Sequence, residues 1–389
     1  MAGRWYADRA RHGEQGMKIL VVTTGLGYGG AERMLLGLSR EWMAAGCDLH
    51  IISLSDEIAL APQFEECGAT VQSLNLGRGP GAFSGLLGLS RAIRRQKPDV
   101  VQTWMPHADL LGGLAARLAG VKNLVWGLHH ADLGRSGLKL STMLVVRCNA
   151  LISWLVPRAI VAVSEHVRQR HIETGYARSR IDVVPNAIDA DRFQFSQQGR
   201  ERIRGELGVA DEAFVVGFLG RFDRVKRLGD FLDAAKGLAN RLENTAFIMA
   251  GDGVDAGNAR LGEMIRSRGL KQRVSLLGVR DDVPDILSAF DVLLCTSQDE
   301  AFGLVVLEAL SCQIPCVSTN NQGCVYAGGA FARYVDVGDV AGFVDATIEI
   351  SQIGAGEIKR WAADARARAV SDFGIKSSAQ RYIELYGGA

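Results

Sequence analysis

The sequence predicts an α/β protein with two similar doubly wound domains that face each other across a cleft. Two observations lead to this fold class. Near the start of the chain, an apolar run rich in β-branched residues enters a glycine loop and then a helical pattern, and the same succession begins again near residue 210. The chain has 389 residues, which is enough for two hydrophobic cores. Clefts between domains are preferred ligand sites, so we expect the binding site there.

The first domain opens with Lys18-Ile-Leu-Val-Val-Thr-Thr24, a run typical of a strand that is buried on both faces of a parallel sheet. Gly25-Leu-Gly-Tyr-Gly-Gly30 follows it, and a helix is predicted from Ala31. This order of elements is the usual beginning of a doubly wound domain. Further strands of the domain are predicted at 48–53, 98–102, 122–126 and 159–163.

The second domain opens with the strand Phe214-Val-Val-Gly-Phe-Leu-Gly220 and a helix over 228–238. Further strands are predicted at 246–250, 274–277, 291–295 and 315–318, a helix at 304–311 and a last helix over about 355–386. The expected organisation is a disordered extension over 1–16, a first domain over 17–195, a polar linker over 196–211, a second domain over 212–370 and a C-terminal helix over 371–389 that crosses back to the first domain.

The composition excludes some classes of function. Lys and Arg number 44 and Asp and Glu 43, for a formal net charge of +1, so the chain lacks the basic excess of a nucleic-acid-binding protein. The seven cysteines are scattered and odd in number, which indicates small buried side chains in a reducing compartment, and a cytoplasmic protein is expected. Cys312 and Cys316 are only a weak metal pattern, because no second pair at zinc spacing accompanies them.

Residues 1–16 are polar and mildly basic and show no secretory signal. The most apolar stretch, Met143 to Val156, is interrupted by Arg147 and Asn149 and is shorter than the ~20 residues that a membrane-spanning helix needs. We interpret it as a core helix, with contact to a membrane as the alternative.

Two groups of residues favour binding of a phosphate. Gly29 and Gly30 lie where a helix start offers backbone N–H groups, and the alternative is a tight turn that packs the helix on the sheet. Arg221 and Lys226 follow the first strand of the second domain, at the sheet edge where ligands bind. The alternative for these cations is a solvated basic patch.

Two glutamates, Glu300 and Glu308, flank the uncharged stretch 301–307. An isolated buried carboxylate is costly, so each needs solvent or partners. Gly303 precedes the helix predicted at 304–311, and a helical side chain at 308 leans back toward the N–H groups of that helix start. We therefore expect both carboxylates to converge on one ligand from two sides, and two surface glutamates are the alternative.

These residues resemble those of the retaining GT-B glycosyltransferases of family four, also called group 1, whose hallmark is two glutamates separated by seven residues. Here the hallmark reads Glu300-Ala-Phe-Gly-Leu-Val-Val-Leu-Glu308. Other pieces match in order over residues 18–388, namely Gly29-Gly-Ala-Glu-Arg33, Ser164-Glu165, Val184-Pro-Asn-Ala-Ile-Asp189, Gly220-Arg-Phe222, Lys226, Gly251-Asp-Gly253, Gly278 and Asp282-Val-Pro284. The resemblance implies the GT-B fold, with two Rossmann-like domains facing an interdomain cleft, and transfer of a sugar from a nucleotide-sugar.

The resemblance also implies where the donor binds. Arg221 and Lys226 would hold the diphosphate, Glu308 the ribose hydroxyls and Glu300 the sugar. The rest of the donor site would comprise the backbone at Val279 against the base, the residues Phe302, Gly303 and Leu304, and Gly29 and Gly30 over the phosphates.

On the acceptor side, the resemblance implies a histidine beside the transferred sugar. His129 is the expected catalytic histidine, and His107 and His130 are expected nearby. Together with Glu300, Arg221 and Lys226, His129 completes the expected catalytic set.

The expected chemistry uses fixed cations and N–H donors to bind the departing diphosphate better than the intact donor. Asp189-Ala-Asp191 has the letters of a D-x-D metal motif but reads as a turn, so no metal and no cofactor are expected. The donor would be a UDP- or GDP-sugar, and transfer would retain the anomeric configuration. A saccharide or lipid-linked acceptor in bacterial surface polysaccharide or glycolipid synthesis is expected, with association at the inner face of the membrane.

One segment, 320–329, departs from the family pattern, because no glutamate occurs between Glu308 and Glu349. Two alternatives therefore stay open, a catalytically degenerate nucleotide-sugar-binding or partner subunit and a GT-B nucleotide-sugar epimerase. A nicotinamide dehydrogenase is disfavoured, because the second predicted strand ends at Ser53 without an acidic residue for the ribose.

Overall fold

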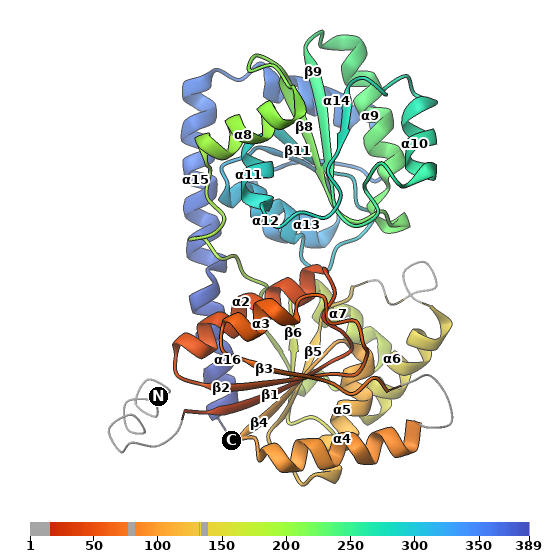
Figure 1. The fold of residues 1–389 in the computed structure, drawn as a ribbon, viewed down its shortest axis with the longest axis vertical. Helices are drawn as coiled ribbons and strands as arrows, with labels where there is room; N and C mark the ends of the chain where they lie inside the picture. The colour runs from red at the N-terminus through yellow and green to blue at the C-terminus, as the bar shows by residue number, and fades with distance from the viewer. Residues whose placement is uncertain (1–15, 77–81, 132, 134–138, 389) are drawn as a thin grey trace. The chain divides into compact units, whose positions relative to one another are not determined.

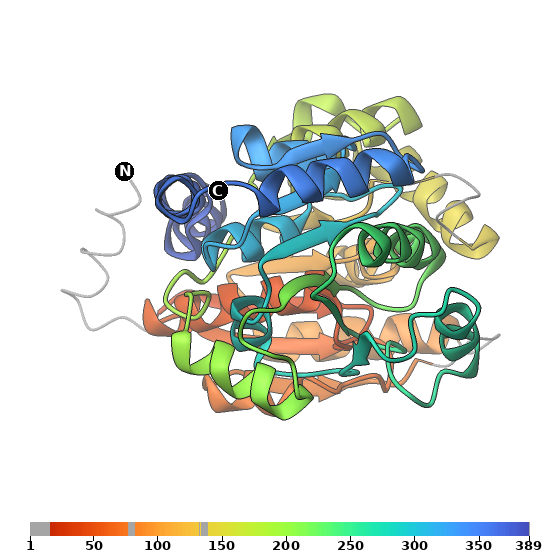
Figure 2. The ribbon, with the colours of Figure 1, turned by 90° about the horizontal axis from the view of Figure 1, so that it is seen from above.

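The computed structural model describes residues 16–76, 82–131, 133 and 139–388. The expected N-terminal extension therefore lies outside the described residues, except for Gly16. The chain forms two compact units, one of residues 1–187 with 375–389 and the other of 188–374. Figures 1 and 2 show each unit as a sheet with helices on both faces, and the predicted α/β fold class is confirmed.

The first unit contains a parallel sheet whose neighbouring strands pair in the order β3-β2-β1-β4-β5-β6-β7. The strands are β1 (Lys18–Thr23), β2 (Asp48–Ser53), β3 (Thr70–Ser73), β4 (Val100–Trp104), β5 (Leu124–Leu128), β6 (Ala159–Ala162) and β7 (Ile181–Val183). The central strands β4, β5 and β6 are buried along their whole length, as expected for a sheet covered on both faces.

Alternate residues of β1 point to two different helical layers. Ile19 and Val21 share a core with α2 (Gly30–Ala44), α3 (Ala61–Glu66) and α16 (Ile375–Gly387). Val22 faces the opposite layer, where Gly112 of α5 (Pro106–Leu118) approaches it so closely that a Cβ there would lie 2.9 Å from its Cγ1. The helices α4 (Ala82–Gln96), α6 (Leu140–Ile152) and α7 (Glu165–Thr174) complete the unit (Figure 1).

The second unit contains a parallel sheet in the order β10-β9-β8-β11-β12-β13, which is the strand order of a dinucleotide-binding Rossmann fold. Its strands are β8 (Phe214–Leu219), β9 (Thr245–Ala250), β10 (Val274–Leu276), β11 (Val292–Cys295), β12 (Cys316–Thr319) and β13 (Arg333–Val335). The order reverses between β8 and β11, so the loops that follow these two strands begin side by side at the carboxyl edge.

The two faces of the second sheet are covered by different helices. One core unites Val216 and Phe218 of β8 with α9 (Leu228–Arg241), α10 (Ala259–Arg266) and α14 (Val340–Ser351). The other face carries α8 (Gln197–Leu207), α11 (Val283–Ser288), α12 (Leu304–Ser311), α13 (Gln322–Gly328) and α15 (Ala355–Phe373), with Gly217 lying under the ring of Phe290.

The segment expected as a linker, 196–211, instead contains helix α8 and belongs to the second unit. Its polar side chains make hydrogen bonds and ion pairs within the second unit. Arg204 is only 2% exposed, donates to the carbonyls of Ala289 and Ala213 and pairs with Asp291 at 2.8 Å. The chain passes between the units at 187–188 and 374–375, so the expected boundaries at 195 and 370 differ from those observed.

The last predicted helix is divided in two. α15 ends at Phe373, Gly374 is extended with φ −63° and ψ 134°, and α16 begins at Ile375. Gly374 forms a parallel bridge with Ile188, whose N–H donates to the Phe373 carbonyl at 2.7 Å. The pairing with Ile188 places Gly374 outside the helix. The sequence pattern is helical on both sides of Gly374, so it does not predict this break.

Candidate functional site

The expected donor residues gather at the carboxyl edge of the second sheet, where the strand order reverses. The turn Gly220–Lys226 follows β8, and the loop 296–303 follows β11. Such a switch point leaves a crevice at the sheet edge, which is the usual ligand position in open α/β sheets.

An ion pair joins the two loops. The Lys226 Nζ lies 2.5 Å from Glu300 Oε1, and the two side chains are only 20% and 17% exposed. Burial by itself lowers the pKa of Lys226, but the Glu300 carboxylate outweighs it and holds this pKa above its ordinary value. Lys226 is therefore a fixed cation at this edge, and it is 74 residues away from its partner in sequence.

Main-chain contacts hold Lys226 in place. The Thr296 hydroxyl donates to the Lys226 carbonyl at 2.9 Å, and the Gln298 N–H donates to the Val225 carbonyl at 2.7 Å. Asp223 caps the short 3₁₀ turn Arg224–Lys226 by accepting the Val225 N–H. Thr296 was not among the residues expected in the site, and its position directly after a buried strand is the signal that points to it.

Arg221 differs from Lys226 in its surroundings. Its side chain is 61% exposed, and its nearest carboxylate is that of Asp223 at 3.7 Å. The structure therefore places this guanidinium at the same sheet edge but does not bring it into the Lys226–Glu300 pair.

The loop that carries Glu300 is packed backbone against backbone on the start of α13. Gly303 has φ +82°, which favours glycine, and a Cβ on it would lie 2.9 Å from the Cα of Cys324. A Cβ on Gly323 would overlap the Glu300 carbonyl oxygen. The segment that departs from the family pattern is thus in direct contact with the glutamate loop.

The other expected donor residues of this segment lie partly in the core and partly at the start of α12. Phe302 is buried and packs edge-on against Tyr326 and Phe373, so its side chain anchors the loop and only its backbone can meet a ligand. Gly303 is the N-cap of α12, Leu304 is its first residue, and Glu308 lies half-buried in its second turn. The expected helix start beside Glu300 is present.

A pair of thiols lies close to the ion pair. Cys295 and Cys324 are buried, with their sulfur atoms 3.7 Å apart. The hydrogen bond from Cys324 lowers the pKa of Cys295 to about 7 against the effect of burial. The same bond and burial raise the pKa of Cys324.

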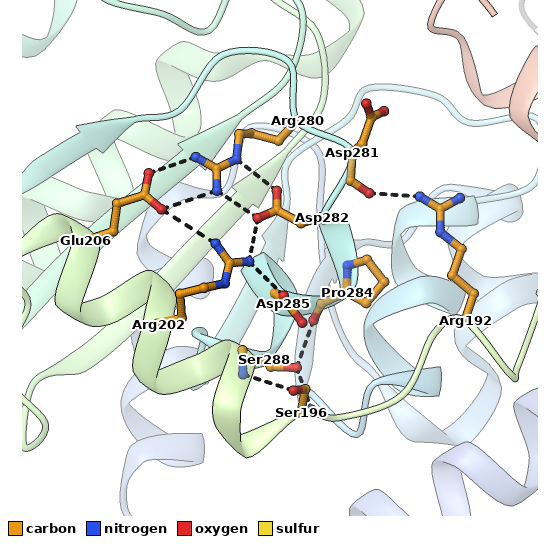
Figure 3. A network of polar contacts seen from close by, with 11 residues as sticks. Arg192, Ser196, Arg202, Glu206, Arg280, Asp281, Asp282, Pro284, Asp285 and Ser288 are labelled. Carbon is orange, nitrogen blue, oxygen red and sulfur yellow. Dashed lines mark hydrogen bonds and ion pairs between the residues drawn. The ribbon is translucent and has the colours of Figure 1, made fainter. Parts of the chain in front are cut away.

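A charged network holds the loop that contains Val279 (Figure 3). Val279 is 42% exposed and follows Gly278, which has φ +65°. Arg280 pairs with Glu206 and Asp282 at 2.7 Å each, and Arg202 of α8 reaches Asp282 at 2.6 Å. These arginines lower the pKa of Asp282 through hydrogen bonds, and the loop is thereby fastened to the helix that the sequence analysis took for a linker.

In the first unit, the expected histidines lie at the carboxyl ends of the adjacent strands β4 and β5. His107 is in the first turn of α5, and His129 and His130 follow β5 directly. The His129 ring stacks on Trp104 with centroids 3.9 Å apart, is 8% exposed, and has no hydrogen-bond partner at either ring nitrogen. Burial, with His130 and His171 nearby, lowers its pKa to about 3, so His129 is neutral at physiological pH.

A buried acid ties these strand ends together. Asp109 of α5 accepts from Thr103 Oγ1 at 2.5 Å and from the backbone of Gly127, two residues before His129. Burial raises its pKa to about 8, despite the hydrogen bonds from Thr103 and Gly127. Asp109 was not expected to have a role, because nothing in the local sequence distinguishes it from an ordinary acid in a first helical turn.

The glycine loop of the first unit lies between β1 and α2. Gly29 is the N-cap of α2, without a capping side chain, and Gly30 is its first residue. The loop also packs on a neighbouring one, because Leu26 donates to the Glu57 carbonyl at 2.6 Å and a Cβ on Gly27 would overlap the Glu57 carboxylate. Both the ligand and the packing explanations of these glycines therefore have a structural basis.

Metal binding and membrane crossing can be assessed for the described residues. Within them, no group of three or more His, Cys, Asp or Glu side chains has an arrangement that could hold a metal ion. None of the described helices combines the length and the apolarity that crossing a bilayer requires.

Two family models match consecutive parts of the chain. Residues 28–192 match the model described as Glycosyltransferase Family 4, and residues 199–366 match the model described as Glycosyl transferases group 1. The two matches follow the two units of the fold closely.

Known proteins resemble the chain over most of its length. An α-1,3-galactosyltransferase of Escherichia coli, named for UDP-Gal and α-D-GlcNAc-diphosphoundecaprenol, is 26% identical over 78% of this chain and 79% of its own. The N-acetyl-α-D-glucosaminyl L-malate synthase of Bacillus anthracis is 26% identical over 67% of this chain and 68% of its own. The crystal structure of Anabaena HepE in complex with UDP-glucose superposes with a TM-score of 0.84, at 22% identity, over 96% of this chain and 100% of HepE.

Proposed function

Because the chain belongs to the GT-B glycosyltransferases of family 4, group 1, and is a transferase, we propose that it moves a sugar from a UDP-sugar to a saccharide or lipid-linked acceptor. UDP is the proposed nucleotide because a protein of the same fold was crystallised with UDP-glucose and a relative is named for UDP-galactose. The named acceptor of that relative, a diphosphoundecaprenol-linked sugar, supports a role in bacterial surface polysaccharide or glycolipid synthesis.

The observation that carries the proposal is the Lys226–Glu300 pair at the β8–β11 switch point. An ammonium has three N–H donors, so Lys226 can keep its bond to Glu300 and still donate to the donor diphosphate. Glu300 in turn has lone pairs left for sugar hydroxyls. The pair can therefore contact the leaving diphosphate through Lys226 and the transferred sugar through Glu300 at the same time.

The proposed reaction proceeds by separation of charge. When the bond between the anomeric carbon and the phosphate oxygen breaks, negative charge develops on the diphosphate and positive character on the sugar. Lys226, with its raised pKa, stays charged throughout, and the start of α12 at Leu304 adds the partial positive charge of a helix N-terminus. Arg221 is 61% exposed at the same sheet edge and is proposed to contact the diphosphate as well.

We propose that transfer retains the anomeric configuration and needs no divalent metal, because fixed cations of the chain supply the charge that a metal would bring to the diphosphate. Glu308 is proposed to bind the ribose, and Val279 to contact the base through its backbone. His129 is neutral and can take part only as a hydrogen-bonding group beside the sugar, not as a fixed cation. The acceptor side is assigned to His107 and His130.

A thermal-shift screen tests the donor. The full chain is heated with UDP-, GDP- and ADP-sugars, each with and without EDTA. At a concentration of 100 Kd, a ligand stabilises the fold by about 2.7 kcal/mol, which is a rise in Tm of about 5–10 °C for a unit of this size. We expect the UDP-sugars to raise the Tm and EDTA to leave the rise unchanged. A shift that EDTA abolishes would overturn metal independence.

A second measurement tests catalysis. The release of UDP is measured in the presence of lipid-linked saccharides. The anomeric configuration of the product is then determined from the NMR signal of its anomeric proton. An α-linked product from an α-linked donor is the expected result, and an inverted product would refute retention. Binding without transfer or donor hydrolysis would instead identify a degenerate relative, and release of a changed sugar without an acceptor would identify an epimerase.

A further inference from the structure

The outer side of α6 carries large apolar side chains that nothing in the described part of the fold covers. Leu140, Leu144 and Leu151 are 72%, 64% and 79% exposed, and in the turn after the helix Trp154 and Leu155 are 55% and 79% exposed. We call these five residues the α6 surface. The helix lies at the edge of the first unit, beside α5 and α7 (Figure 1).

The α6 surface is a continuous stripe and not a set of scattered residues. Positions 140, 144, 147 and 151 are spaced four, three and four residues apart, which places them on one face of a helix. The position between the leucines is Arg147, which is also exposed. The opposite face of the helix, with Val146, Asn149 and Ala150, is buried in the unit. The predicted core helix is thus apolar on two faces, and only one of them is in the core.

Cations outnumber acids in the sequence around the α6 surface. Residues 133–164 contain four Lys and Arg residues and no Asp or Glu. Lys139 and Arg147 of this stretch are exposed, and Lys122 and Arg178 are exposed on neighbouring segments. The acids of the adjacent helix α7, Glu165 and Glu173, pair with Arg168 and Arg170 of that helix.

Hydrogen bonds from other parts of the first unit fix the backbone next to Trp154 and Leu155. Arg117 Nε donates to the Val156 carbonyl at 2.6 Å, and Arg180 donates to the Pro157 carbonyl. The Ala177 N–H donates to the Ser153 hydroxyl at 2.9 Å. Two arginines therefore keep the apolar tip in a fixed outward position, with their charge just behind it.

We infer that the α6 surface docks the protein on an anionic lipid bilayer. Leucines and a tryptophan on a helix and turn flanked by cations are the composition of an interfacial anchor, in which the apolar side chains enter the acyl boundary and the cations meet lipid phosphates. A second copy of the chain fits less well, because a symmetric interface would bring like cations together. The inference adds a membrane surface to the proposed function, and its test needs neither donor nor acceptor.

Co-sedimentation with vesicles tests the docking. The full chain is expected to bind vesicles that contain phosphatidylglycerol, to bind phosphatidylcholine vesicles more weakly, and to dissociate as salt is raised. Brominated lipids should quench Trp154, and the quenching should be lost in Trp154→Phe. Failure to bind phosphatidylglycerol vesicles at low salt would overturn the inference.

A matched pair of variants locates the surface. Leu151→Gln with Leu155→Gln should lower the vesicle partition coefficient about a hundred-fold, since each buried leucine contributes roughly a ten-fold factor. The control, Leu87→Gln with Val370→Gln, changes two exposed apolar residues elsewhere, at 37% and 40% exposure, and should bind as the unaltered chain does. Equal loss in both variants, or no loss in the first, would refute the assignment.

Two further readouts separate the outcomes. Analytical ultracentrifugation without lipid should give a monomer, and a dimer that the Leu151/Leu155 variant dissolves would show that a second copy covers the surface instead. The same variant should keep its thermal shift with UDP-sugars. Loss of vesicle binding with an intact nucleotide shift therefore supports the docking surface, while a missing nucleotide shift in the unaltered chain counts only against the proposed donor.

Discussion

Replacing Lys226 by methionine removes the cation of the central ion pair while keeping an unbranched side chain that is only one atom shorter. It leaves Glu300, which is 17% exposed, without its 2.5 Å partner. Breaking a fully buried pair costs about 3–5 kcal/mol, and an exposed pair is worth about 0–1 kcal/mol. With both side chains about four-fifths buried, we expect a loss of about 2–3 kcal/mol in the free energy of unfolding of the second unit, or a fall in Tm of about 4–12 °C.

The double variant Lys226→Met with Glu300→Gln separates stability from function. Removing the orphaned carboxylate should restore most of the lost stability, so a double-mutant cycle should show a coupling of about 1–3 kcal/mol. The transfer rate should not recover, because the cation that binds the leaving diphosphate is still missing, and a loss of about a hundred- to a thousand-fold in kcat is expected.

The assays are urea and thermal unfolding of Lys226→Met, Glu300→Gln and the double variant beside the unaltered chain, and the initial rate of UDP release. Measurements at neutral pH are appropriate, because Glu300 raises the pKa of Lys226 above its ordinary 10.5 and the stability from the pair is lost only as the pH rises through that raised value. If Lys226→Met is as stable as the unaltered chain, or if the double variant is no more stable than the single one, the pair does not hold the two loops as described.

Four further predictions concern other parts of the two sites. Glu308→Ala should slow transfer by about ten- to a hundred-fold, since hydrogen bonds to charged groups are worth ~1.5–3 kcal/mol, and a rate equal to that of the unaltered chain would reject its role at the ribose. Arg221→Ala should lower kcat more than it raises KM, and an effect on KM alone would argue against leaving-group stabilisation. Gly323→Ala should lower both the Tm and the transfer rate, because its Cβ would overlap the Glu300 carbonyl, whereas Gly354→Ala, at a position with open space around it, should change neither. Asp109→Asn should alter the pH dependence of unfolding, because burial raises the pKa of Asp109 to about 8. The contribution of Asp109 to the free energy of unfolding is full below the ordinary value of 3.8 and is lost as the pH rises through 8. If the free energy of unfolding falls just as steeply between pH 3.8 and 8 after the substitution, this reasoning is refuted.

The sequence predicts the fold well because its signals are local. The β-branched runs at 18–24 and 214–220 became β1 and β8, and the helix expected at 304–311 became α12 with the same bounds. The boundaries between the units were less predictable. A polar segment reads as a linker, and only the folded chain shows that Arg204 is buried against Asp291 and the carbonyls beside it.

The site is predictable in its parts but not in its connections. The spacing of Glu300 and Glu308 marks one helix start, and Lys226 stands out as a cation after a strand. That Lys226 pairs with Glu300 depends on the order of β8 and β11 in the sheet, which no local pattern contains. Phe302 differs from these residues. Its place in the hallmark predicted a contact with the ligand, whereas its side chain packs in the core against Phe373.

The close approach of Gly323 to the Glu300 loop divides the segment 320–329 into positions of two kinds. Gly323 and the helix-capping Asn321 belong to the framework, and libraries that vary them would sample mostly misfolded proteins. Gln322 and Val325 of the same turn are exposed. Directed evolution toward a different sugar can therefore randomise these two neighbours of the glutamate loop while the architecture beneath them is kept.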